Sequence, residues 1–151
     1  MISIVRTKPE FADTLTQITI SAKRHWKYPE KWIQLWLPQL TITAEYVSEN
    51  EVWAASDEGR IVGYYALRQV NRDCWLDNLW VLPGFMDRGI GRSLFEHALG
   101  RCRELDGSIL KIEADPNAQG FYEHMGARKV GEHHTSVENQ PRILPLMEIQ
   151  V

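Results

Sequence analysis

The chain has 151 residues, of which 44% are hydrophobic and 25% are charged, and its formal net charge is -3. This length predicts one domain, and the composition is that of an ordinary globular protein. The acidic balance argues against a nucleic-acid-binding protein, because such proteins usually carry a basic face.

The cysteines and the hydropathy of the chain indicate its cellular compartment and its relation to membranes. Cys74 and Cys102 lack the spacing of a zinc or redox motif, so we expect two reduced thiols, no metal and a cytoplasmic protein. The N-terminal residues lack the apolar core of a signal peptide. No run approaches the roughly 18 apolar residues of a membrane span, so a membrane partner is not expected.

The first half of the chain predicts a strand, two helices and a hairpin. The β-rich run 2–7 is followed by a helical pattern from Pro9 to about His25. A second, short helix is expected to open near Pro29 and to close before Pro38. The runs 51–56 and 60–70 then flank "DEG", which is typical of a hairpin.

The second half predicts alternating strands and helices. Strands are expected at 74–81, 108–114, 127–134 and 142–151, with a loop near Asn139 to Pro141 joining the last two. One-sided apolar spacing predicts a helix from Gly89 to about Asp106. Asp115 at an N-cap and Gly126 at a C-terminal stop enclose the last helix. The whole order predicts an α+β domain with a central sheet.

The stretch "VLPGFMDRGIGRSLF" at 81–95 has the outline of a strand, a glycine loop and a helix start. A Walker A loop would end in Gly-Lys-Ser/Thr, and a dinucleotide loop would need a third glycine. Both spacings fail here. A third template uses backbone amides at a helix N-terminus to hold a pyrophosphate, with Arg88 and Arg92 nearby for charge. The alternative is a turn that holds its glycines for geometry only.

A second motif favours the phosphate template. "LWVLPGFMDRGIGRSLF" together with the later "DPNAQGFYEHMGARKVGE" resembles the GNAT superfamily of acyl-CoA-dependent N-acetyltransferases. The resemblance covers about residues 61–132. Matches in order and spacing are Gly89, Gly91, Ala118, Phe121, Tyr122 and Gly126. The chain departs from the family at Met86, where arginine or glutamine is usual, and at Asp115, where asparagine is usual.

The resemblance implies a single GNAT-like domain over 1–151, with a mixed, mostly antiparallel, splayed sheet flanked by helices. It implies acceptor-side helices at about 9–40 and an acetyl-CoA-binding core at about 61–132. The implied reaction transfers an acetyl group from acetyl-CoA to a primary amine of a small molecule or peptide by direct attack. The alternative is a non-catalytic acyl-CoA-binding or regulatory module of the same fold.

The same resemblance implies the donor site. The backbone at the end of the strand before the loop would bind the pantetheine arm and the thioester oxygen, and loop amides would bind the pyrophosphate. Asp115 is expected to cap its helix, and Asn117 to contact the pantetheine arm. The implied cofactor-binding residues are Leu79, Trp80, Val81, Met86, Asp87, Arg88, Gly89, Ile90, Gly91, Arg92, Asn117, Phe121 and Tyr122.

The chemistry needs an acid for the leaving thiolate and a base for the amine. Tyr122 matches the family's general acid, although it also lies on an apolar helix face and could be a core residue. The family's occasional glutamate base is replaced by Trp75. Asp77 and Glu113 are the remaining base candidates, and a water chain is a third option. Of the adjacent His133 and His134, at most one can face a site, because strand neighbours point to opposite faces.

An aromatic segment lies between the first strand and the hairpin. Trp26, Tyr28, Trp32 and Trp36 would form an apolar wall for the acceptor amine. The ordinary alternative is a short amphipathic helix that buries these rings in the core. Exposed rings would instead mark the surface of a homodimer.

Overall fold

The computed structural model describes residues 1–151 and contains seven strands and five α-helices. The chain forms two compact units, Met1–Leu67 with Asn78–Glu96, and Arg68–Asp77 with His97–Val151. Strands β3 (Arg60–Val70) and β4 (Asp73–Val81) and helix α4 (Ile90–Glu104) contribute residues to both units. No helix has the length and apolar character needed to span a membrane.

The strands follow the order β1-β2-β3-β4-β5-β7-β6. The pairing of β4 with β5 is parallel, whereas β1 with β2, β2 with β3, β5 with β7 and β6 with β7 are antiparallel. The expected α+β fold with a mixed, mostly antiparallel sheet is therefore confirmed. The remaining strands are β1 (Ile2–Arg6), β2 (Glu51–Asp57), β5 (Ile109–Glu113), β6 (Arg128–Val137) and β7 (Gln140–Gln150).

The core of the first unit forms under helix α1 (Ala12–His25), which a 3-10 turn at Pro9–Phe11 introduces. Leu15 and Ile18 recur at helical spacing and are fully or almost fully buried. They join buried residues of β2 and β3 in one cluster. The hydroxyl groups of Tyr64, a member of that cluster, and of the buried Thr19 lie 2.6 Å apart, so each has a hydrogen-bond partner.

Two helices differ from the sequence prediction. Helix α2 (Glu30–Leu40) runs through Pro38, where we expected it to stop. Because Pro38 lies in the last turn, its missing N–H breaks one bond only, and the Thr41 amide still closes the helix on the Leu37 carbonyl at 3.0 Å. The six-residue helix α3 (Ala44–Glu49) was missed, although the Thr43 hydroxyl caps it by accepting from the Tyr46 amide.

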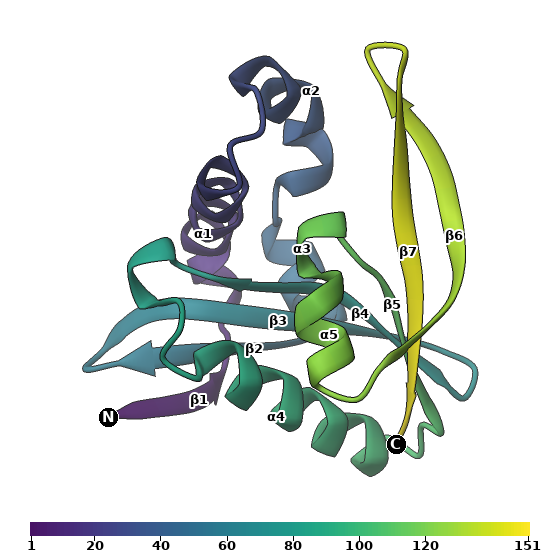
Figure 1. Ribbon diagram of the computed structural model, residues 1–151. Coiled ribbons are helices and arrows are strands. Elements are labelled where there is room, and N and C mark those ends of the chain that lie inside the picture. The colour runs from purple at the N-terminus through teal and green to yellow at the C-terminus, as the bar shows by residue number, and fades with distance from the viewer. The chain divides into compact units, whose positions relative to one another are not determined.

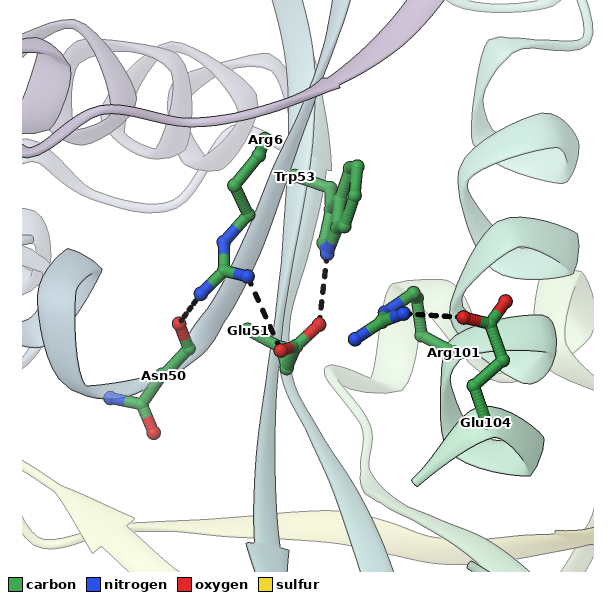
Figure 2. Close-up of polar contacts among 6 residues, drawn as sticks. All are labelled: Arg6, Asn50, Glu51, Trp53, Arg101 and Glu104. Atoms are coloured by element: carbon green, nitrogen blue, oxygen red, sulfur yellow. Dashed lines mark hydrogen bonds and ion pairs between the residues drawn. The ribbon is translucent and has the colours of Figure 1, made fainter. Parts of the chain in front are cut away.

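Polar side chains join β1 to the start of β2 in the first unit (Figure 2). Arg6 donates to the Glu51 carboxylate at 3.3 Å and to the Asn50 carbonyl at 3.0 Å. The Trp53 indole donates to the other Glu51 oxygen at 3.1 Å, and the Arg6 guanidinium lies over the Trp53 ring. Figure 2 also shows a separate pair in the second unit, Arg101 with Glu104 on α4. These groups fix β1 on β2 and add a local pair to α4.

The second unit is built on a long hairpin of β6 and β7, and β7 lies between β5 and β6 (Figure 1). Glu138 and Asn139 form its turn with φ of 50° and 63°. Two consecutive positive φ values are typical of a type I′ turn. The backbone twist of this turn matches the right-handed twist of the two strands that it joins. The turn therefore precedes the predicted loop slightly, since Gln140 and Pro141 already belong to β7.

The two cysteines meet Gly107 inside the second unit. Both thiols are buried, and burial together with Cys74 raises the pKa of Cys102 to about 12. A Cβ on Gly107 would collide with the Cys102 sulfur and would lie 2.9 Å from the Cys74 sulfur. Only glycine therefore fits where the chain leaves α4.

We expect Gly107→Ala to lower the free energy of unfolding by about 1–3 kcal/mol, because the added methyl group overpacks the two sulfurs. Chemical denaturation followed by circular dichroism measures this. Gly100→Ala is the matched control on α4, where a Cβ would meet nothing within 4 Å. That change should stabilise the helix by about 0.5–1 kcal/mol. Equal effects of the two substitutions would contradict the packing argument.

Candidate active site

The glycine loop joins β4 to α4 in the first unit. After β4, a 3-10 turn at Pro83–Phe85 leads to Met86, whose amide donates to the Pro83 carbonyl at 3.2 Å. Asp87 and Gly89 have φ of 62° and 79°. At the start of α4, the Ser93 amide donates to the Gly89 carbonyl at 3.0 Å. The amides of residues 90–92 therefore open the helix without intrahelical acceptors, as anion-binding helix starts do.

The charged side chains of this loop have partners of their own. The Arg88 guanidinium lies 4.9 Å from the centre of the Phe85 ring, and Arg60 of β3 lies 5.4 Å from the same ring. Arg92 pairs with Glu96 at 2.8 Å on the exposed face of α4. The Phe85 ring therefore lies against two guanidinium groups beside the loop. The sequence analysis predicted a role here for Arg88 but not for Arg60.

The end of β4 carries the predicted thioester contacts. Val81 is buried, and the Trp80 indole donates to the Asn78 side chain at 2.9 Å. A Cβ on Gly63 of β3 would lie 3.0 Å from the Trp80 carbonyl oxygen. Glycine at this position therefore lets the two strands approach closely where the predicted site begins.

The parallel ladder of β4 and β5 is short. Its register covers Asp73↔Ile109, Cys74↔Leu110 and Trp75↔Lys111. The ladder ends there, although β4 continues to Val81 and β5 continues to Glu113. Backbone groups past Trp75 and Lys111 have no partner in this ladder, which is the arrangement that a splayed strand pair requires.

Asp115 lies at the turn that precedes α5 (Gln119–His124) in the second unit. One Asp115 oxygen accepts from the Asn117 amide at 2.9 Å and from the Asn117 side chain at 3.0 Å. Asp115 therefore caps the 3-10 turn Pro116–Ala118 that leads into α5, whereas the N-cap of α5 itself is Ala118. The other oxygen lies 3.3 Å from Arg142 of β7. The Asp115 and Arg142 side chains are only 6% and 14% exposed, so this ion pair is buried.

Tyr122 lies in α5 and is 6% exposed. Its ring contacts Phe121 edge to face, with 5.2 Å between the ring centres. Burial, and to a smaller extent the Asp115 charge, raise the pKa of Tyr122 well above its ordinary value of about 10. The phenol therefore keeps its proton at neutral pH, as a proton donor must.

The two base candidates have different partners. Asp77 of β4 pairs with Arg68 at 3.3 Å. Glu113, the last residue of β5, lies 2.8 Å from Nδ1 of His133 on β6. Of the two histidines considered from the sequence, His133 contacts a base candidate and His134 contacts Glu132 instead.

The aromatic segment forms a cluster in the first unit. Trp26 contacts Trp80, and Tyr28, Trp32 and Trp36 contact one another, with ring centres 5.1–6.3 Å apart. These rings are half-buried, so they are neither fully core nor fully surface. Lys23, which the sequence did not single out, is 7% exposed. Its ammonium lies 4.9–5.2 Å from the ring centres of Tyr28, Trp36 and Trp80.

The first unit therefore holds the strand end at Leu79–Val81, the glycine loop and the aromatic cluster, and brings Trp26 onto Trp80. The second unit holds Asn117, Phe121 and Tyr122 with both base candidates. Three residues were missed as partners in these groups: Lys23, Arg60 and Arg142. No sequence pattern predicts these contacts, because single basic residues outside a motif are usually solvated.

The chain matches known proteins over most of its length. The family model described as "Acetyltransferase (GNAT) domain" matches residues 20–144. The peptidyl-lysine N-acetyltransferase YjaB of Salmonella typhimurium is 27% identical over 149 residues, which cover 87% of this chain and 97% of that protein.

Two solved structures share the fold. A GCN5-related N-acetyltransferase from Rhodopseudomonas palustris has a TM-score of 0.86 at 20% identity, covering 99% of this chain and 95% of that one. The PaiA N-acetyltransferase of Thermoplasma acidophilum, solved with coenzyme A, has a TM-score of 0.77 at 16% identity, covering 100% and 99%. Because the family model spans most of the chain, this protein belongs to the GNAT family of acetyltransferases.

Proposed function

We propose that this acetyltransferase transfers the acetyl group of acetyl-CoA to a primary amine of a small molecule or peptide by direct attack. The observation that carries the proposal is the glycine turn that opens α4, within a chain that the GNAT family model spans from residue 20 to 144. The name of the Salmonella relative specifies a peptidyl-lysine acceptor, which supports the peptide side of the proposal.

Donor binding is assigned first to backbone amides. The Met86 amide already donates to Pro83, so the phosphate-binding amides of the proposal begin at Asp87 and continue to Arg92. Leu79, Trp80 and Val81 offer backbone groups to the pantetheine arm and the thioester oxygen. We also propose that acetyl-CoA contacts three residues of the second unit, Asn117, Phe121 and Tyr122.

Three events complete the transfer. The amine loses a proton, its nitrogen attacks the thioester carbon, and the sulfur of coenzyme A leaves with a proton. Tyr122 is the proposed donor of that last proton, because its phenol stays protonated at neutral pH. Trp26, Tyr28 and Trp32 are proposed to contact the acceptor amine, with Trp36 completing the aromatic wall.

The cytoplasmic location and the homodimer remain predictions.

Two measurements test the function. Acetyl-CoA should raise the melting temperature of the protein, since a ligand that binds only the folded state stabilises it. Release of free thiol should then follow when acetyl-CoA is mixed with a panel of primary amines that includes lysine peptides. A thermal shift with no thiol release across the panel would favour the non-catalytic acyl-CoA-binding module. Absence of a shift would contradict donor binding itself.

Gly89 gives the sharpest test of the loop. Alanine and tryptophan at this position carry the same strain of about 1 kcal/mol, because φ is 79° and only glycine adopts it freely. A Cβ here meets nothing within 4 Å, so the two variants differ in bulk in front of the loop amides. We expect Gly89→Trp to abolish acetyl-CoA binding in calorimetry while Gly89→Ala keeps it within a few-fold. Equal affinities of the two variants would refute the loop assignment.

A further inference from the structure

One histidine of the β6–β7 hairpin is joined to a base candidate across the sheet of the second unit. Nδ1 of His133 lies 2.8 Å from a carboxylate oxygen of Glu113. Strand β7 brings them together, since its Leu146 pairs with Glu113 and its Leu144 pairs with His133. The two side chains are 52% and 41% exposed, so both are open to a substrate.

Glu113 lies on the more exposed side of β5. Along β5, Leu110 and Ile112 are buried, whereas Lys111 and Glu113 point the other way and are at least partly exposed. Glu113 is also two residues past the last pair of the β4–β5 ladder, Trp75↔Lys111. The carboxylate therefore lies past the point where that ladder ends.

The contact determines which ring nitrogen of His133 is available. A carboxylate accepts hydrogen bonds, so Nδ1 carries the proton that Glu113 accepts. The neutral ring then has its lone pair on Nε2, on the side turned away from Glu113. A carboxylate that fixes the tautomer of an imidazole base is the arrangement found in hydrolytic triads.

We infer that His133 accepts the proton of the acceptor amine at Nε2, with Glu113 as the residue that positions its ring. The inference rests on the proposed acetyl transfer. In that step, the amine proton moves to Nε2, the new N–C bond forms and the C–S bond breaks. The thiolate of coenzyme A takes its proton from Tyr122, and solvent returns both residues to their starting states.

Several charged groups lie around His133. Glu113 faces it from β5, and Glu132 and His134 adjoin it on β6. Lys129 pairs with Glu132 on the same strand, and Arg142 of β7 pairs with Asp115. Glu113 is the charge in direct contact with the ring, so its removal should change the tautomer most.

His134 provides a matched control, because it is the next residue of the strand, is more exposed, and contacts Glu132 instead. With acetyl-CoA and the best amine of the panel as substrates, His133→Gln should lower kcat/KM by about 10²-fold or more. It should also change the dependence of kcat/KM on pH, because the proton acceptor of the reaction is lost. His134→Gln should leave kcat/KM and its pH dependence unchanged, and Glu113→Gln should give a kcat/KM between those of the two histidine variants.

Nitrogen NMR of the histidine side chains gives an independent measurement. We expect the neutral ring of His133 to carry its proton on Nδ1 in the native protein and to lose this preference in Glu113→Gln. A native ring protonated on Nε2 overturns the inference. So does a His133→Gln enzyme with native rates and pH profile, while turnover by the native enzyme still upholds the acetyltransferase function. A native enzyme that acetylates no amine overturns the function and the inference together.

Discussion

Tyr122→Phe should lower the turnover number by about 10²-fold or more while leaving the affinity for acetyl-CoA within a few-fold. Removing a general acid costs rate in this range, because the leaving thiolate must then take its proton from water. The ring remains to pack against Phe121, so the fold should be retained. Steady-state kinetics with saturating amine, together with calorimetry of acetyl-CoA binding, measures both effects.

The pH dependence of the turnover number provides a second test of Tyr122 as the acid. Burial raises the pKa of Tyr122, so the phenol is in its protonated, acid form below that raised value. The native enzyme should therefore show no loss of rate from Tyr122 ionisation below about pH 10, the ordinary phenol value. A descending limb that lies between pH 8 and 9 and disappears in Tyr122→Phe would contradict this account.

Tyr64→Phe is the matched control for the loss of a buried hydroxyl. Tyr64 is fully buried, and its hydroxyl lies 2.6 Å from that of Thr19. Losing this bond should cost about 1 kcal/mol of stability without a specific loss of turnover. If Tyr122→Phe behaved in the same way, Tyr122 would be a packing residue and the proposed acid would have to be sought elsewhere.

Short sequence patterns at turns and helix ends were sufficient to predict most of the strands and helices. The proline at Pro9, the "DEG" turn and the glycine stop at Gly126 each determine a chain reversal or a helix end within a few residues. The family resemblance rested on two motifs of this kind. The error at Pro38 has the same origin, since the rule that proline ends a helix weakens in the last turn, where few bonds remain to be lost.

Long-range pairs in the candidate site could not be predicted. Glu113 and His133 are 20 residues apart, and Asp115 and Arg142 are 27 apart. Both contacts depend on the register of β5, β6 and β7, including an irregularity between Lys129 and Gly131. A one-residue change of register would turn His133 to the opposite face and bring His134 to its place. The sequence therefore left two histidines and two carboxylates as equal alternatives.

Asp115 and Arg142 form the long-range pair with the largest expected effect on stability. Their side chains are almost fully buried, and Asp115 also caps the turn before α5. Arg142→Met keeps most of the side-chain volume and removes the charge. It leaves the Asp115 carboxylate buried without that counter-charge, which should cost about 3 kcal/mol of the free energy of unfolding. Urea denaturation followed by circular dichroism measures this loss.

A second substitution separates lost charge from lost packing. Asp115→Asn in the Arg142→Met background removes the stranded charge and keeps an oxygen that can accept from the Asn117 amide. The double variant should therefore be more stable than Arg142→Met alone. Lys129→Met, which breaks an exposed pair on the same hairpin, should have a much smaller effect. Additive losses in the double variant would show that the two side chains stabilise the protein independently, and the buried ion pair would then not anchor β7 to the start of α5.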